Sequence, residues 1–172
     1  MSVKEVTSLR KNGNLKEAYK MAIDDLKEDR NNSWAQMSLF WVLRDMCQQL
    51  FSKNVIDEAK ICLKEMSSLL PTMVDDSGAG ERAYTNLYKQ LQPNAGIILK
   101  ASELSKDDPS NAYVQVRNYI DSPNDVDSAL HEDLGWIIYR YIKAKISDLS
   151  SLEVRTLLKD YMFLNNERPC LL

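Results

Sequence analysis

Residues 14–26 read NLKEAYKMAIDDL, and this stretch decides the fold. Its apolar side chains recur every three or four positions, which places them on one face of an α-helix; they are Leu15, Ala18, Tyr19, Ala22, Ile23 and Leu26. Asn14 and Glu17 have the spacing of a capping box, in which the two side chains accept hydrogen bonds from free backbone N–H groups. The stretch therefore predicts a helix that begins after Asn14 and ends before the polar run at 29–32.

The same signals recur along the chain and predict a series of helices. Their expected ranges are about 33–51, 54–70, 82–91, 97–106, 109–120, 126–146 and 151–165, and the helix over 126–146 is expected to be the longest. Further start signals are Ser33 with Gln36, Asn54, Asp108 before Pro109, and Ser150 with Glu153. The helix over 33–51 carries too many apolar positions for one narrow stripe, so we expect it to be packed between neighbours.

The composition favours an all-α fold. Only 5 glycines and 5 prolines occur among 172 residues, and all five prolines lie at predicted joints between helices. No alternating strand pattern is flanked by an Asn-Gly or Asp-Gly turn, so no β-hairpin is indicated. The length suits one compact domain or a short row of repeating helical units.

Charge and cysteine usage exclude several classes of partner and site. The net charge is -3, and no basic run with interleaved aromatic residues occurs, so a nucleic-acid partner is disfavoured. Charged residues interrupt any apolar signal-peptide core at the N-terminus, and the longest uncharged stretch, around Trp136, is far too short to span a bilayer. Cys47, Cys62 and Cys170 form no Cys-x-x-Cys pair. We therefore expect a cytoplasmic protein without a membrane partner, disulfide framework or zinc site.

Two parts of the sequence resemble each other at an offset of about 95 residues, which suggests a duplication. Three successive helices match in order: residues 18–19 with 112–113, 39–43 with 134–138, and 58–69 with 153–164. This predicts two related units, 1–92 and 93–172, within one continuous superhelical domain. The counterpart of the helix at 82–91 would begin at roughly position 177. We therefore expect that the second unit is truncated and that the chain is the N-terminal piece of a larger protein. The apolar ending Pro169-Cys170-Leu171-Leu172 supports the same expectation.

Parts of the first 75 residues resemble a tetratricopeptide repeat. Gly13, Glu17, Ala18 and the closing turn at 31–32 fit the second helix and exit turn of that family, and Ala59 and Pro71 repeat the alanine and proline places. The match departs from the family at Arg30, where proline is usual, and in lacking the Trp-to-Leu-Gly spacing. The resemblance implies a right-handed α-solenoid of about seven to eight antiparallel helices that binds a protein or peptide on a concave surface, without catalysis.

Candidate catalytic residues each have a structural interpretation that we favour. His131 is the only histidine, and its neighbours Glu132 and Asp133 could form an acid/base group, but carboxylates near a helix start also suit the helix dipole. Cys47 and Cys62 lie on apolar helix faces and are expected to be core residues rather than nucleophiles. We expect no catalytic residue in this chain.

Candidate ligand sites in the middle of the chain are equally weak. Asp75, Asp76 and Glu81 could suggest a calcium loop, but their spacing is not that of an EF-hand, so a flexible loop is favoured. Gly78-Ala79-Gly80 lacks the Lys and Ser/Thr of a phosphate loop. Trp41 and Trp136 are interpreted as packing between repeats rather than as ligand platforms. We expect no metal and no cofactor.

The best candidate binding surface is the polar side of the two long helices. It comprises Arg44 and Gln48 on the first and Arg140 and Lys143 on the second, at related positions in the two units. A charged group on an otherwise apolar helix needs a solvent-facing groove, a partner or an intramolecular ion pair. We expect a protein-interaction or scaffolding module. The alternative is a helical accessory domain of an enzyme or nucleic-acid-processing protein whose active part lies beyond residue 172.

Overall fold

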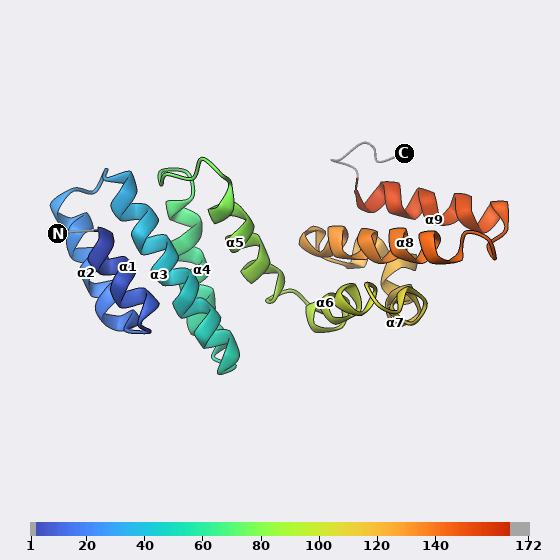
Figure 1. Ribbon diagram of the computed structural model, residues 1–172, viewed down its shortest axis with the longest axis horizontal. Coiled ribbons are helices and arrows are strands. Elements are labelled where there is room, and N and C mark those ends of the chain that lie inside the picture. Colours follow the sequence, from blue (N-terminus) through green and yellow to red (C-terminus); the bar gives the residue numbers. More distant parts are fainter. Residues whose placement is uncertain (1–2, 166–172) are drawn as a thin grey trace. The chain divides into compact units, whose positions relative to one another are not determined.

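The computed structural model describes residues 3–165, and every regular element within them is a helix (Figure 1). The expected all-α class is confirmed for this part of the chain. Nine α-helices and two short 3-10 helices follow one another: α1 Val3–Lys11, α2 Leu15–Glu28, α3 Ser33–Ser52, α4 Ile56–Leu69, α5 Ala79–Lys89, α6 Ala95–Leu104, α7 Pro109–Asp121, η1 Pro123–Asp125, η2 Ser128–Leu130, α8 His131–Lys145 and α9 Ser151–Leu164. The prediction missed α1. The C-terminal residues from Pro169 to Leu172, including Cys170, lie outside the described range.

The helices divide into two compact units, one up to Tyr88 and the other from Lys89 onward. The sequence places the boundary between 92 and 93. In unit 1, α1 contacts α2, α2 contacts α3 and α3 contacts α4, and α1 also contacts α3. In unit 2, α6 contacts α7, α7 contacts α8 and α8 contacts α9, and α6 also contacts α8. A duplication and a right-handed solenoid stay predictions.

The core of unit 1 is built around α3. Phe40, Leu43 and Cys47 are fully buried on this helix, which contacts α1, α2 and α4. Neighbours on several sides explain why its apolar residues exceed one stripe, as the sequence indicated. In unit 2 the corresponding role falls to α8, where Leu134, Ile137 and Ile138 are buried.

At three of the predicted helix starts, either the capping interaction or the first helical residue differs from the prediction. The side chain of Asn14 makes no capping hydrogen bond. The cap of α3 is Asn32 rather than Ser33, because the Asn32 side chain accepts hydrogen bonds from the backbone N–H groups of Trp34 and Ala35. Asn54 has φ 58, a left-handed conformation, and α4 begins only at Ile56. Asparagine tolerates this conformation well, and the chain turns there before the helix starts.

Two other predicted starts are confirmed. Asp108 caps α7, since its side chain accepts a hydrogen bond from the backbone N–H of Asn111. Ser150 and Glu153 form a complete capping box at α9. These pairs each satisfy a free N–H of a first helical turn, so the local sequence was sufficient to predict them.

The expectation of one longest helix over 126–146 is wrong. Residues 123–130 form η1 and η2, α8 begins at His131, and the longest helix among residues 3–165 is α3, with 20 residues. Asp127 is extended and accepts a hydrogen bond from the backbone N–H of Ala129, which favours a short turn. The Nε2 atom of His131 lies 3.1 Å from the carbonyl oxygen of Val126, so that oxygen is satisfied without an α-helix.

Candidate functional site

Arg140 of α8 is held in place by two hydrogen bonds to the C-terminal end of α6 and the residue that follows it. Its Nη1 atom donates to the Ser105 hydroxyl at 2.7 Å and to the Ser102 carbonyl oxygen at 3.2 Å. The guanidinium carbon also lies 5.5 Å from the centre of the Trp136 ring, a cation–π distance. Arg140 is therefore half-buried and oriented before any partner binds.

Two aromatic side chains lie beside Arg140 on the same helix. Trp136 and Tyr139 are each 38% exposed, and their rings meet edge to face with centroids 5.7 Å apart. Tyr139 also lies 6.4 Å from the ring of Tyr161 on α9. The interpretation of Trp136 as core packing is wrong, because the neighbouring residues Leu134, Gly135, Ile137 and Ile138 take the inward positions of α8.

Lys143 continues this surface by one further turn. Residues 136, 139, 140 and 143 are spaced i, i+3, i+4 and i+7, so they lie along one side of α8. Lys143 is exposed. We call this set the α8 stripe: Trp136, Tyr139, Arg140 and Lys143. Two of the four residues predicted as a binding surface, Arg140 and Lys143, belong to it.

The other two predicted residues lie in unit 1. The Nη1 atom of Arg44 pairs with the carboxylate of Asp45 at 2.7 Å, and Asp45 is also 3.6 Å from Arg10. Arg10 in turn lies over the ring of Trp41, with 5.9 Å to its centre. Gln48, four residues after Arg44 on α3, is exposed. Arg44 is therefore paired with a carboxylate, which it shares with Arg10, whereas the partners of Arg140 are uncharged.

His131, Glu132 and Asp133 do not form a shared acid/base group. The Nε2 atom of His131 lies within hydrogen-bond distance of two backbone carbonyls, at 3.2 Å and 3.1 Å. The carboxylate of Asp133 pairs with Lys89 at 2.8 Å, and both side chains are largely buried. Glu132 and Asp133 lie in the first turn of α8, as predicted, where negative charge suits the helix dipole.

Cys47 and Cys62 are buried, as the sequence indicated. The thiol of Cys47 lies 3.6 Å from the carbonyl oxygen of Ala59. Burial raises the pKa of Cys47 to about 12. Burial also raises the pKa of Cys62, with smaller effects of the carboxylates of Glu65 and Glu58. Both thiols are therefore protonated at neutral pH and poor nucleophiles.

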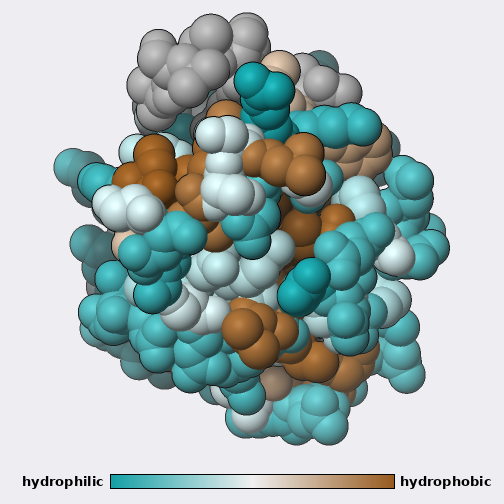
Figure 2. Space-filling model, turned by 90° about the vertical axis from the view of Figure 1, so that its right-hand side faces the viewer, coloured by the Kyte–Doolittle hydropathy of each residue, from teal (hydrophilic) through white to brown (hydrophobic). Residues whose placement is uncertain are grey.

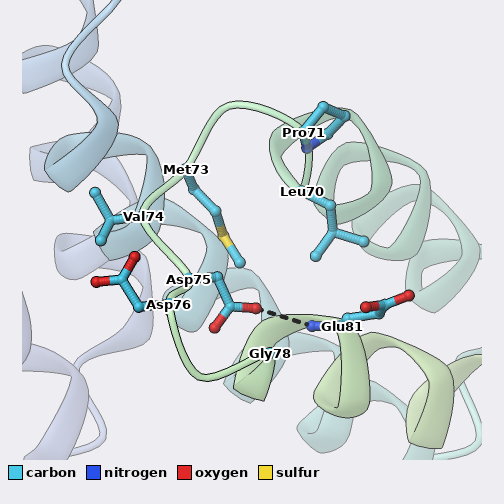
Figure 3. A pocket seen from close by; sticks show the side chains of 8 residues that line it. All are labelled: Leu70, Pro71, Met73, Val74, Asp75, Asp76, Gly78 and Glu81. Carbon is cyan, nitrogen blue, oxygen red and sulfur yellow. Dashed lines mark hydrogen bonds between the residues drawn. The ribbon is translucent and has the colours of Figure 1, made fainter.

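The loop between α4 and α5 borders an open pocket of about 590 Å³ (Figure 3). Leu70 and Met73 contribute apolar surface, and the carboxylates of Asp76 and Glu81 point to different sides of the loop. Within residues 3–165, no three His, Cys, Asp or Glu side chains come together as a group that could hold a metal ion. The acidic residues that suggested a calcium loop thus do not converge.

Asp75 has a structural role that the sequence analysis missed. Its carboxylate accepts hydrogen bonds from the backbone N–H groups of Ala79 and Gly80, both at 2.9 Å, and of Glu81 at 3.3 Å. This cap explains why α5 begins at Ala79 rather than at 82. A Cβ atom on Gly80 would meet the terminal methyl group of Met73 and lie 3.0 Å from Oδ2 of Asp75, so a larger residue there would require the Met73 side chain to shift.

Several further apolar side chains of unit 2 are exposed. Leu152 is 75% exposed and Met162 64%, both on α9, and Val114 on α7 is 71% exposed. Figure 2 faces the side on which α7, α8 and α9 lie and shows hydrophobic groups among mostly hydrophilic ones. Single exposed apolar residues are ordinary on protein surfaces. The α8 stripe differs because its aromatic rings contact each other and a fixed arginine.

Two remaining observations concern the chain as a whole. Among the described helices, none has both the length and the apolar character needed to cross a bilayer. Comparison with protein-family models, with curated proteins and with solved structures finds no match. The tetratricopeptide resemblance therefore stays a prediction that rests on the residues quoted for it.

Proposed function

We propose that this chain is a non-catalytic helical module that binds a protein or peptide partner, and that the α8 stripe is its contact surface. The observation that carries the proposal is the exposed pair Trp136 and Tyr139, whose rings contact each other, with the guanidinium group of Arg140 over the Trp136 ring. Trp, Tyr and Arg are the residue types that contribute most to binding energy at protein interfaces. The tetratricopeptide-like character proposed for the chain agrees with this function.

The rigidity of the stripe supports the proposal. Ordering a long side chain on binding costs about 0.5–1.5 kcal/mol. Arg140 is already held by Ser102 and Ser105, and the ring of Trp136 contacts both Arg140 and Tyr139. A partner that docks on the stripe therefore loses little binding energy to ordering these side chains.

Affinity capture with matched variants tests the proposal. Wild-type protein, Trp136→Ala and Trp34→Ala are immobilised at equal density and exposed to extract, and bound proteins are quantified. Trp34 is 55% exposed on α3 in unit 1, so its substitution removes an exposed indole outside the stripe. We expect proteins that are retained by wild type and Trp34→Ala but lost from Trp136→Ala. Equal retention by all three proteins, with unchanged circular dichroism, would contradict the proposal.

A further inference from the structure

We infer that the partner segment recognised by the α8 stripe is acidic, presenting a carboxylate beside an apolar side chain. This inference rests on the proposed function and adds the chemical class of the partner. It follows from the charges on the stripe rather than from its aromatic rings.

The stripe carries two positive charges, and neither forms an ion pair with a carboxylate among the residues that the structure describes. The partners of Arg140 are a carbonyl oxygen, a hydroxyl group and the Trp136 ring, all uncharged. Lys143 is exposed and forms no ion pair within residues 3–165. Arg140 and Lys143 are three positions apart, so the two charges lie one helical turn from each other.

Three carboxylates that are close in sequence to the stripe, or to the serines that hold Arg140, each form an ion pair with a lysine. Glu103 of α6, close in sequence to the serines that hold Arg140, forms an ion pair with Lys106. Asp148, beyond the end of α8, pairs with Lys145 at 3.6 Å. Asp133 pairs with Lys89. These ion pairs leave the positive charges of the stripe available to a carboxylate from outside, a pairing that electrostatic complementarity favours.

The spacing along α8 sets the arrangement expected in the partner. Trp136 and Lys143 are seven residues apart, which corresponds to about 10 Å along the helix axis. An extended segment spans this distance in about three residues. We therefore expect an aromatic or aliphatic side chain over Trp136 and Tyr139, and an Asp or Glu two or three residues away that reaches Arg140 or Lys143.

Fluorescence anisotropy with labelled peptides tests the inference on the full chain. The probes are three fluorescein-labelled 12-residue peptides of the same Leu and Phe pattern, whose polar positions are all Glu, all Gln or all Lys. The protein variants are Lys143→Glu and the control Lys16→Glu, an exposed lysine on α2 in unit 1 with the same change of net charge. A third variant, Trp136→Ala, reports on the aromatic part of the stripe.

We expect the Glu peptide to bind most tightly, and Lys143→Glu to weaken it by roughly 3- to 10-fold while Lys16→Glu leaves it unchanged. Raising the salt concentration should weaken binding of the Glu peptide more than that of the Gln peptide. Equal affinity for all three peptides, no binding of the Glu peptide, or equal effects of the two lysine variants would overturn the inference. If the inference fails in one of these ways but Trp136→Ala no longer binds the Gln peptide, the proposed function still stands. If Trp136→Ala binds the Gln peptide as tightly as wild type does, the proposed function itself is contradicted.

Discussion

Replacing Asp75 by Ala should loosen the start of α5. The Asp75 carboxylate accepts hydrogen bonds from three consecutive backbone N–H groups, at 2.9, 2.9 and 3.3 Å. Ala79 has a second acceptor, the Ser77 hydroxyl at 3.3 Å, so the N–H groups of Gly80 and Glu81 lose most. After the substitution these groups have only water as an alternative partner.

The size of the effect follows from two contributions. Loss of a helix cap costs about 0.5–2 kcal/mol. Loss of a negative charge at a helix N-terminus costs a further amount of about 0.3–1 kcal/mol. We therefore expect the free energy of unfolding to fall by about 1–3 kcal/mol, with a drop in Tm of about 2–4 °C for each kcal/mol in a chain of this size.

Two measurements check this expectation. Urea unfolding followed by circular dichroism gives the change in stability, and amide hydrogen exchange gives the protection of Gly80 and Glu81. Asp76→Ala is the matched control, because Asp76 is an exposed carboxylate on the same loop; its effect should stay within about 0.5 kcal/mol. Equal stability of the two variants, or unchanged protection of both amides in Asp75→Ala, would refute the capping role of Asp75.

Four further predictions concern packing, thiol reactivity, the pH dependence of stability and a buried ion pair. Gly80→Ala should destabilise unit 1 by about 1 kcal/mol in urea unfolding, since its Cβ would displace the terminal methyl group of the buried Met73 and lie 3.0 Å from the Asp75 carboxylate that caps α5. Because the pKa of Cys47 is about 12 in the folded protein against an ordinary 9.0, its thiol should resist a thiol reagent at pH 8 unless urea is added. For the same reason its contribution to stability is complete below pH 9 and is lost as the pH rises towards 12; a Cys47→Ala variant should lack this part of the pH dependence. Asp133→Ala should lower stability by about 3 kcal/mol, because it leaves the buried ammonium group of Lys89 without its partner at 2.8 Å; a shift below 0.5 kcal/mol or so would argue against this pair.

Much of the fold was predictable because its signals are local. Apolar spacing identified eight of the α-helices, and Asp108 and the Ser150–Glu153 pair predicted the starts of α7 and α9. The errors arose where several residues compete to cap one turn. Asn32 rather than Ser33 caps α3, and Asp75 acts on α5 from four residues before the helix. Spacing alone does not distinguish such competitors.

The candidate surface was predictable only in part. Arg44 and Arg140 look alike in sequence, each a cation on a long apolar helix. Asp45, the next residue in the chain, pairs with Arg44, whereas Arg140 contacts Ser102 and Ser105, which are more than 30 residues away. The prediction for Trp136 was wrong for a related reason. A large aromatic residue suggests a core position, but its smaller neighbours Leu134, Gly135, Ile137 and Ile138 take the inward positions of α8.

The sequence by itself determined that this protein is helical, where most of its helices lie and that its two described cysteines are core residues. Helical periodicity and capping depend on residues within a few positions of each other, so they can be recognised in the sequence alone. Only the tertiary structure decided which charges are compensated, which rings stay exposed and where the 3-10 turns replace an expected helix. These outcomes depend on contacts between residues distant in sequence, such as the hydrogen bonds from Arg140 of α8 to Ser102 of α6 and to Ser105, the residue that follows this helix.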